Sequence, residues 1–318
     1  MENTKLPIKI DLPSSFFEEE ERDGYVVSKG MKKIWAVLFD LLSEFIRVCD
    51  KYNIRWYADG GTILGAVRHK GMIPWDDDID VMMIRSEYER FLKEAKDEFK
   101  HPYFLQTEQT DKGSIRGHAQ LRNSLTTGIL KSEQYLNCPF NQGLFIDIFP
   151  IDNIPDSDDE INDLTSEILK YKKLSRHLRD ISLCYRYHFR KNIFLSVKHC
   201  IQHMMYQLYF KKTGKYVYEG AYSRYESLLT SCTDNQSKYV AKLVMCPYKP
   251  RRKWLRSWFD DVEYLTFEMF NLPVPKGYVE LLDVFYGDWR TFKMGTATHG
   301  GIIADAEKPY KKSLDLEE

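Results

Sequence analysis

Four aspartates stand within five positions in the stretch GMIPWDDDIDVMM, residues 71–83, between a tryptophan and a run of apolar residues. Asp78 and Asp80 alternate with Ile79 and Val81, which is the pattern of a strand with one polar and one buried face. Side chains two apart on a strand point the same way, roughly 6–7 Å apart. Two carboxylates that close cannot both stay ionised unless a cation joins them. The spacing therefore predicts a site for a hard divalent ion, Mg²⁺ or Mn²⁺, with room for substrate phosphates.

A third carboxylate further along the chain is also flanked by apolar residues in a strand pattern. Asp147 stands between Ile146 and Ile148 in GLFIDIFPID, an otherwise apolar strand pattern that Pro150 interrupts. An ionised carboxylate placed among apolar residues needs a partner. We therefore expect Asp147 to complete the metal site from a neighbouring strand.

Two other interpretations of the aspartate cluster explain less. Asp76, Asp78, Asp80 and Glu87 fit positions 1, 3, 5 and 12 of a calcium-binding EF-hand loop, but Val81 occupies the sixth position. That position needs glycine for its sharp turn, and a β-branched residue does not readily adopt the positive φ. A plain acidic surface turn would leave the apolar residues 79–84 unexplained.

A candidate phosphate-binding turn precedes the aspartates, in YADGGTILGAVRHKG. Gly60 and Gly61 end a short strand and leave backbone N–H groups unobstructed, and Thr62 opens a helix whose N-terminus favours anions. A strand, a Gly-Gly-Thr turn, a helix, an Asp-x-Asp strand and a later lone Asp form the layout of the nucleotidyltransferase fold. There, metal ions align a nucleophile with a phosphorus atom and neutralise developing charge.

Composition indicates a folded globular protein, and the predicted strands and helices place it in the α+β class. The 318 residues are 43% hydrophobic and 14% aromatic, enough for a substantial core. No apolar run reaches the roughly 18 residues of a membrane span, and the N-terminus does not resemble a signal peptide, so the expected location is the cytoplasm. The six cysteines are scattered without a C-x-x-C pair, which argues against a disulfide framework or zinc ribbon.

Charge is unevenly distributed, although the net charge is −1. Residues 170–256 hold 20 Lys and Arg against 4 Asp and Glu, a net charge of +16, so the remainder carries −17. This basic, aromatic segment is predicted to be helical and either contacts an anionic membrane or a phosphate-rich glycan, or is a subdomain with solvated lysines. No nucleic acid is expected as a partner. His199 and His203 have a helical metal-binding spacing, but without further ligands they are interpreted as surface residues.

The motifs together resemble the LicD family of phosphocholine transferases, which includes the fukutin-related ribitol-phosphate transferases. The resemblance runs through YADGGTILGAVRHKGMIPWDDDIDVMMIRSEYERF, LRNSLTTGI and GLFIDIFPID, and more loosely through FEMFNLPVPKGYVELLDVFYGDW and EKPY. Met269 departs from it, because the family usually has glycine there. The implied fold is a nucleotidyltransferase-like mixed sheet flanked by helices, with a basic helical insertion. We divide the chain into an N-terminal extension (1–30), the core (31–165), the insertion (166–256) and a C-terminal part of the core (257–318).

The resemblance implies transfer of a phospho-alcohol, such as phosphocholine, from a CDP-linked donor to a sugar hydroxyl, with release of CMP. The acceptor would be a cell-surface glycan or its lipid-linked precursor, which suits an enzyme at the inner face of a membrane. Asp78, Asp80 and Asp147 match the metal-binding carboxylates. A phosphate loop is matched by Gly60, Gly61 and Thr62.

Further roles are hypotheses. Asp147 is near enough to draw a proton from the acceptor hydroxyl, and Arg68 and Lys70 offset charge on the leaving CMP unless they form only a salt bridge at the helix end. Arg122 is a second candidate for phosphate binding. Trp75 could wall the alcohol site. Three more residues complete the set: Asp76 and Asp77, which position the strand, and His299, which could line the site.

Two competing functions remain open at the level of sequence. A nucleotide-sugar glycosyltransferase also uses Asp-x-Asp and a metal, but it would be expected to have an early parallel βαβ run and would not need Asp147. A non-catalytic glycan- or membrane-binding module would have no reason to keep crowded carboxylates.

Overall fold

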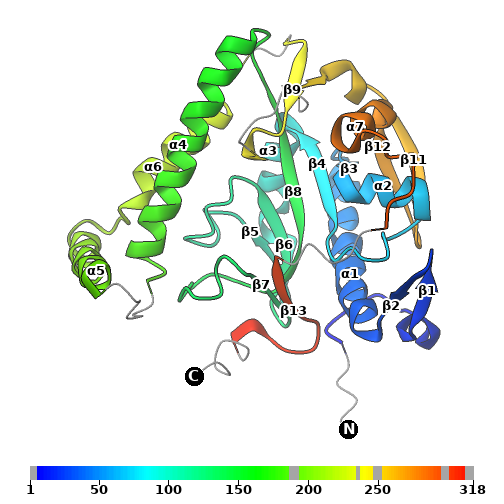
Figure 1. The fold of residues 1–318 in the computed structure, drawn as a ribbon, viewed down its shortest axis with the longest axis horizontal. Coiled ribbons are helices and arrows are strands. Elements are labelled where there is room, and N and C mark those ends of the chain that lie inside the picture. The colour runs from blue at the N-terminus through cyan, green and yellow to red at the C-terminus, as the bar shows by residue number, and fades with distance from the viewer. Residues whose placement is uncertain (1–5, 186–192, 234–236, 246–252, 295–300, 312–318) are drawn as a thin grey trace.

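A seven-stranded mixed sheet forms the centre of the computed structural model, which describes residues 6–185, 193–233, 237–245, 253–294 and 301–311 (Figure 1). The central strand, β8, has ten residues. It pairs in parallel with β4 on one side, and antiparallel with β6 and then β9 on the other. The predicted α+β class with a mixed sheet is confirmed. The strands of this sheet are β3 (Tyr57–Ala58), β4 (Asp80–Ile84), β5 (Tyr103–Gln106), β6 (Ala119–Asn123), β8 (Leu144–Asn153), β9 (Tyr239–Ala241) and β10 (Trp254–Leu255).

Helix α1 (Lys29–Tyr52) packs along β8 and β6. Its apolar residues recur at helical spacing, and side chains such as Trp35, Phe39 and Phe45 are completely buried. Ser28 caps the helix, accepting a hydrogen bond from the Met31 amide at 3.2 Å. Three further helices flank the same sheet: α2 (Gly60–His69), α3 (Arg85–Glu94) and α7 (Tyr278–Tyr286).

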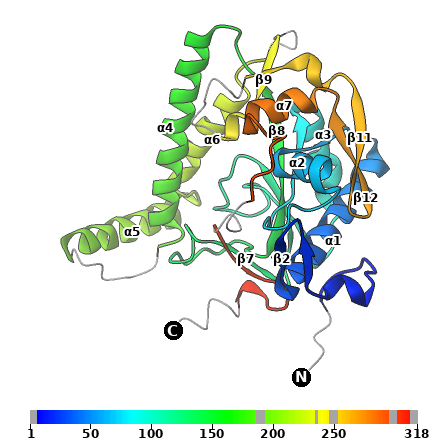
Figure 2. The ribbon, with the colours of Figure 1, turned by 45° about the vertical axis from the view of Figure 1, so that its right-hand side comes forward.

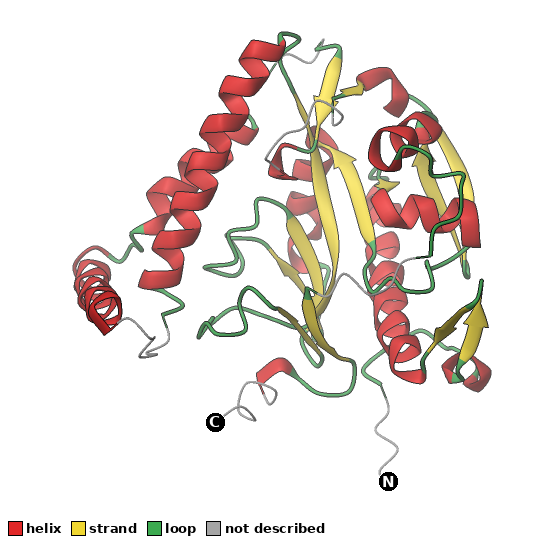
Figure 3. Cartoon of the chain, viewed as in Figure 1, coloured by secondary structure: helices red, strands yellow, loops and turns green. Residues whose placement is uncertain are grey.

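A separate layer of helices lies on the other side of the sheet from α2 and α7 (Figure 3). It consists of α4 (Asp158–Ser182), α5 (Ile193–Thr213) and α6 (Tyr218–Leu229). Helix α6 packs against α4 and buries Tyr218 and Tyr225 in the core. The segment predicted as an insertion, 166–256, also contains β9 and β10, which extend the main sheet. Its helical part is therefore shorter than the predicted range.

The described residues also form three two-stranded sheets: β1 (Glu20–Arg22) with β2 (Tyr25–Val27), β7 (Thr127–Leu130) with β13 (Ile302–Asp305), and β11 (Val262–Phe267) with β12 (Phe270–Pro275). Short 3₁₀ helices span Ser14–Phe17, Ala95–Asp97, Leu243–Met245 and Arg256–Phe259.

The turn between β11 and β12 explains the departure at Met269. Glu268 carries the positive φ of this turn, 52°, so Met269 needs no glycine-like backbone and lies half exposed. The Glu268 carboxylate pairs with Arg22 and accepts a hydrogen bond from the Met72 amide at 3.0 Å. A Cβ on Gly71 would collide with the Glu268 carboxylate, which these partners hold in place, so glycine is favoured at position 71.

Candidate active site

Asp80 and Asp147 are direct neighbours on two parallel strands. The register of β4 against β8 pairs Asp80 with Asp147, and that of β6 against β8 pairs Gln120 with Asp147. In-register residues on adjacent strands project from the same face of a sheet. Strand β4 begins at Asp80, so Asp78 lies in the segment just before it rather than on the strand as predicted. The structure thus brings together carboxylates that are far apart in the sequence.

The surroundings of Asp80 disfavour an isolated negative charge. Burial raises its pKa well above the ordinary aspartate value, and the charges of Asp78, Asp147 and Asp59 add to the effect, while Lys242 opposes it. Four carboxylates therefore act on one another electrostatically at this point of the sheet.

Two side chains from β6 and its approach hold Asp147. His118 Nε2 lies 2.9 Å and Gln120 Nε2 2.7 Å from the same oxygen, Asp147 Oδ1. Burial alone would raise the pKa of Asp147, but the charge and hydrogen bond of His118, with that of Gln120, bring it below the usual value. The His118 ring also packs on Phe149, with 4.5 Å between centroids. Neither His118 nor Gln120 was predicted, although the alternation of His118, Gln120 and Arg122 marks one polar strand face.

The Gly-Gly-Thr turn ties α2 to the aspartates. Thr62 Oγ1 accepts a hydrogen bond from the Asp80 amide at 3.0 Å, and the Asp59 amide donates to the Asp80 carbonyl at 3.0 Å. Gly60 has a φ of 47°, and a Cβ on Gly61 would lie 2.9 Å from Asp76 Oδ2. The glycines therefore permit the close approach of acidic side chains to the helix N-terminus, and buried Thr62 joins this helix to β4.

A cavity of about 620 Å³ opens beside this turn, a size suited to a small-molecule substrate. Gly60, Gly61, Asp78 and Asp80 form one wall. The other lining residues are Leu64, Arg68, Ile73, Trp75, Asp76, Lys242, Met245, Phe285, Tyr286, Asp288, Trp289, Thr291 and Lys293. Asp147 is next to Asp80 on the sheet but is not part of the cavity wall.

Lys242 provides a cation at the site that sequence reasoning missed. Its ammonium pairs with the carboxylate of Asp59, the N-cap residue of α2, which is completely buried. The ammonium also lies over the rings of Phe149 and Phe285, 4.7 and 5.2 Å from their centroids. Lys242 follows β9, in a part of the chain that no quoted motif covers, so the sequence carries no signal for its role.

The donor atoms fit a hard divalent cation. Asp80 Oδ1 and Asp59 Oδ1 are buried and have no hydrogen-bond partner among the described residues. Mg²⁺ takes oxygen ligands and is often held by one or two carboxylates plus substrate phosphates. Within the same part of the chain, no group of three or more His, Cys, Asp or Glu side chains is placed to hold a metal ion in this conformation. The metal ligation by Asp78, Asp80 and Asp147 stays a prediction.

Arg68 and Lys70 occupy different environments. Arg68 lines the cavity, and its guanidinium donates to the Thr291 carbonyl at 2.8 Å. Lys70 ends α2 in the left-handed conformation, with an exposed side chain outside the cavity wall. Arg68 is therefore placed for a role toward a ligand in this cavity, and Lys70 is not.

Arg122 is a structural residue in this conformation. It is completely buried, and it donates to Gln106 Oε1 at 2.7 Å, to the Gly143 carbonyl at 2.6 Å and to Gln120 Oε1. Burial lowers its pKa to about 9. The direct phosphate contact predicted for Arg122 does not agree with this position. Its guanidinium instead orients Gln120, which in turn bonds Asp147.

The remaining predicted residues have these positions. Trp75 lines the cavity and packs edge-on against Phe292, with 5.9 Å between centroids. Asp76 and Asp77 are buried, and the Asp76 carbonyl accepts a hydrogen bond from Trp35 Nε1 at 2.9 Å. His203 Nδ1 bonds the Ile181 carbonyl at 2.7 Å, and His199 stands on the same helix, α5. His299 lies outside the described residues.

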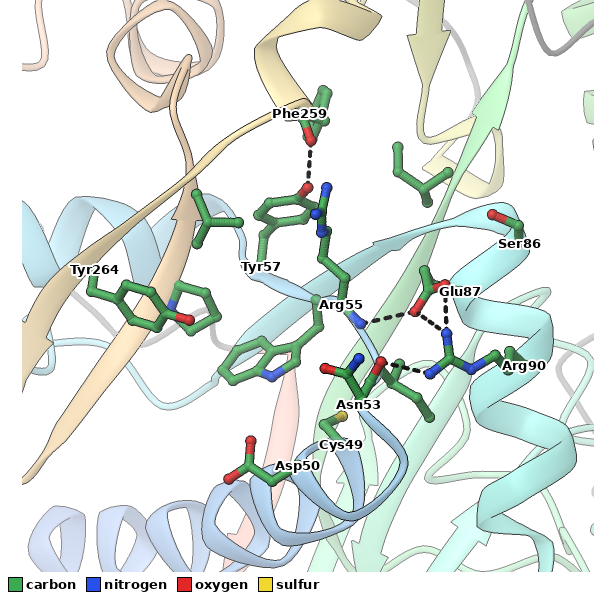
Figure 4. A pocket seen from close by; sticks show the side chains of 15 residues that line it. Cys49, Asp50, Asn53, Arg55, Tyr57, Ser86, Glu87, Arg90, Phe259 and Tyr264 are labelled. Carbon is green, nitrogen blue, oxygen red and sulfur yellow. Dashed lines mark hydrogen bonds and ion pairs between the residues drawn. The ribbon is translucent and has the colours of Figure 1, made fainter.

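A second cavity, of about 700 Å³, lies at the end of α1, between α3 and β11 (Figure 4). Its central charged group is Glu87, which accepts hydrogen bonds from Arg90 Nη1 at 2.9 and 3.1 Å and from the Arg55 amide at 2.9 Å. None of Asp78, Asp80 and Asp147 lines this cavity. Asp78 and Asp80 line the smaller cavity, which is therefore the candidate site.

Comparison with known proteins agrees with the nucleotidyltransferase-like class that the sequence motifs indicate. Residues 53–178 match the family model described as LicD/FKTN/FKRP, nucleotidyltransferase domain. This part of the chain is thus similar to the nucleotidyltransferase domain of the LicD family, and the resemblance noted in its sequence is confirmed.

Individual relatives extend this comparison. The chain is 28% identical, over 80% of its own length and 88% of the relative's, to the lipopolysaccharide cholinephosphotransferase LicD of Haemophilus influenzae. It is also 40% identical over 50 residues to the uncharacterized proteins RP689 of Rickettsia prowazekii and RT0683 of Rickettsia typhi. Those two matches cover 16% of this chain, and 19% and 16% of the relatives.

Proposed function

We propose that this protein transfers phosphocholine, or a similar phospho-alcohol, from a CDP-linked donor to a sugar hydroxyl of a glycan or lipid-linked glycan, and releases CMP. The observation that carries the proposal is the register that pairs Asp80 with Asp147 beside the N-terminus of α2. The similarity to a lipopolysaccharide cholinephosphotransferase supports both the phosphocholine group and the glycan acceptor.

The position of each residue in the site determines its proposed role. The backbone N–H groups of Gly60 and Gly61 at the N-terminus of α2 would bind a donor phosphate. Asp78, Asp80 and Asp147 would hold Mg²⁺, which when bound neutralises charge on the diphosphate. Two donors fix the orientation of Asp147, and we assign this carboxylate the proton of the acceptor hydroxyl.

Two cations complete the proposed site. Lys242 and Arg68 both line the cavity, and we assign them to the negative charge of the phosphates and of the departing CMP. The bond between the phosphorus and the bridging oxygen of CMP breaks as the acceptor oxygen bonds to phosphorus, so the bridging oxygen leaves with CMP and carries the new negative charge. Arg122 and Gln120 act by positioning Asp147.

CMP release from CDP-choline, CDP-ribitol and a panel of nucleotide sugars, each with and without Mg²⁺, tests the reaction. We expect Mg²⁺-dependent release from a CDP-alcohol, and a loss of at least about a hundredfold in Asp80→Ala. Asp261→Ala is the matched control, because that carboxylate is 69% exposed and pairs only with Lys276 among the described residues. Turnover of nucleotide sugars alone would establish a glycosyltransferase, and no turnover of any donor would favour a binding module.

A further inference from the structure

Helix α5 turns an apolar face to solvent. Phe194, Ile201, Met205 and Leu208 are 85, 49, 61 and 66% exposed. Their spacings of seven, four and three residues place them on one side of an α-helix. Val197, Met204 and Tyr209 are exposed on the same helix as well. A water-facing helix of a folded protein normally shows charged and polar residues on this side.

Three polar residues of α5, Ser196, His203 and Gln207, face the protein instead. Ser196 is 4% exposed. His203 Nδ1 bonds the Ile181 carbonyl at 2.7 Å, and Gln207 Nε2 donates to the Ser182 carbonyl at 2.6 Å, so both anchor α5 to the end of α4. Apart from its lysines, which are exposed, the helix therefore directs apolar residues outward and polar residues toward α4. Its outer side fits an apolar environment.

The position of α5 leaves this face accessible. The helix lies at the outer edge of the layer formed by α4 and α6, away from β11 and β12, in both views of the ribbon (Figures 1 and 2). Among the described elements it packs mainly against α4. The apolar face is thus remote from the cavity that holds Asp78 and Asp80.

Charge identifies the kind of surface that fits. Helix α5 contains Lys198, Lys211 and Lys212 and no acidic residue, and the sequence has no Asp or Glu between Asp180 and Glu219. A second copy of α5 against this face would bring lysines together without any carboxylate to pair them. A surface of anionic lipid offers both the apolar layer and the negative headgroups.

We propose that α5 docks on an anionic lipid bilayer, lying parallel to its surface. Phe194, Ile201, Met205 and Leu208 would enter the boundary of the acyl chains, while the lysines reach the headgroups. None of the described helices has the length and apolar character of a membrane span. This inference does not depend on the proposed transfer reaction, although a lipid-linked acceptor would meet the enzyme at the same surface.

Sedimentation of the full chain with vesicles tests the proposal. We expect binding to phosphatidylglycerol–phosphatidylcholine vesicles that weakens with salt, and much weaker binding to phosphatidylcholine alone. Phe194→Ser with Leu208→Ser should lower the partition coefficient at least about tenfold. Lys211→Glu with Lys212→Glu should lower it on anionic vesicles by a similar factor. The matched control is Tyr264→Ser with Met269→Ser, which removes exposed apolar side chains from β11 and its turn and should leave binding unchanged.

Other results would overturn the proposal. These are no binding of the unaltered chain, equal losses in the control pair, or a dimer that the Phe194 and Leu208 substitutions dissociate while vesicle binding is absent. Circular dichroism checks that each variant is folded. CMP release with a soluble acceptor should be the same in the α5 variants as in the unaltered chain, which separates failure of membrane docking from failure of the proposed reaction.

Discussion

Replacement of Lys242 by methionine isolates the buried ion pair at the start of α2. The ammonium pairs with Asp59, whose carboxylate is completely buried, and the Lys242 side chain is only 8% exposed. Methionine keeps most of the length and the apolar contacts of lysine but removes the charge. Asp59 is then left buried without its cation.

The expected loss of stability is about 3–5 kcal/mol, because the breaking of a buried pair leaves an uncompensated charge. The cation–π contacts with Phe149 and Phe285 are also lost, at about 0.5–2 kcal/mol. Contacts of the methionine sulfur with the same rings return about 0.3–1.5 kcal/mol, which roughly offsets that second loss. The net effect stays near the cost of the unpaired carboxylate.

Urea denaturation of four proteins measures this: the unaltered chain, Lys242→Met, Asp59→Asn and the double variant. The double variant should recover at least about 2 kcal/mol relative to the sum of the single losses, since neither charge then remains. Lys276→Met is the control, because Lys276 and Asp261 are 64 and 69% exposed, and such pairs contribute about 0–1 kcal/mol. A Lys242→Met loss as small as that of the control, or additive single losses, would refute the argument.

Three further predictions concern stability. Glu133 is buried between Arg116 and Arg179, and those charges lower its pKa to about 2 from 4.5 against the effect of burial. Ionised Glu133 therefore contributes about 3 kcal/mol to the free energy of unfolding at pH values above its unfolded pKa, and this contribution is lost as pH falls from about 5 to 2. Glu133→Gln should be less stable than the unaltered chain near pH 7. In urea denaturation the variant should also lack this loss of stability in the acid range. A steeper slope in the variant would contradict this sign. Gly71→Ala should lose about 1–3 kcal/mol of stability in thermal denaturation, because its Cβ meets a Glu268 carboxylate already held by two partners. Gly220→Ala, with open space inside α6, should gain about 0.5–1 kcal/mol of stability. The reverse order of these two stabilities would refute the packing argument. Arg122→Lys, which cannot reproduce the bonds to Gln106, Gly143 and Gln120, should lose about 2–4 kcal/mol in urea denaturation, and an unchanged midpoint would contradict its structural role.

The sequence predicted those strands and helices whose residue pattern lies within one segment of the chain. Alternation around Asp80 and the apolar run around Asp147 predicted two strands, and the pairing of those strands follows from the fold class. The apolar residues of α1 recur at helical spacing, so this element follows from its own segment of sequence. The start of β4 was not, because Asp78 has the same alternating neighbours as Asp80 and only the contact with β8 decides where pairing begins.

The partners of these residues could not be read in the same way. His118 and Gln120 reach Asp147 through the register of β6 against β8, and strand register depends on long-range packing. Lys242 follows β9, far from the aspartates in the sequence, and no local residue pattern predicts its contact with Asp59. For Arg122 the polar strand face was visible, but its burial among acceptors depends on the loops that close over it.

A crystal structure of the protein with CDP and Mn²⁺, in which the ion is located by its anomalous scattering, tests the central claim most directly. The account predicts an anomalous peak between the CDP diphosphate and carboxylate oxygens of Asp78, Asp80 and Asp147. A peak in the cavity beside Glu87, or CDP bound beside Gly60 and Gly61 without any ion at these aspartates, would contradict it.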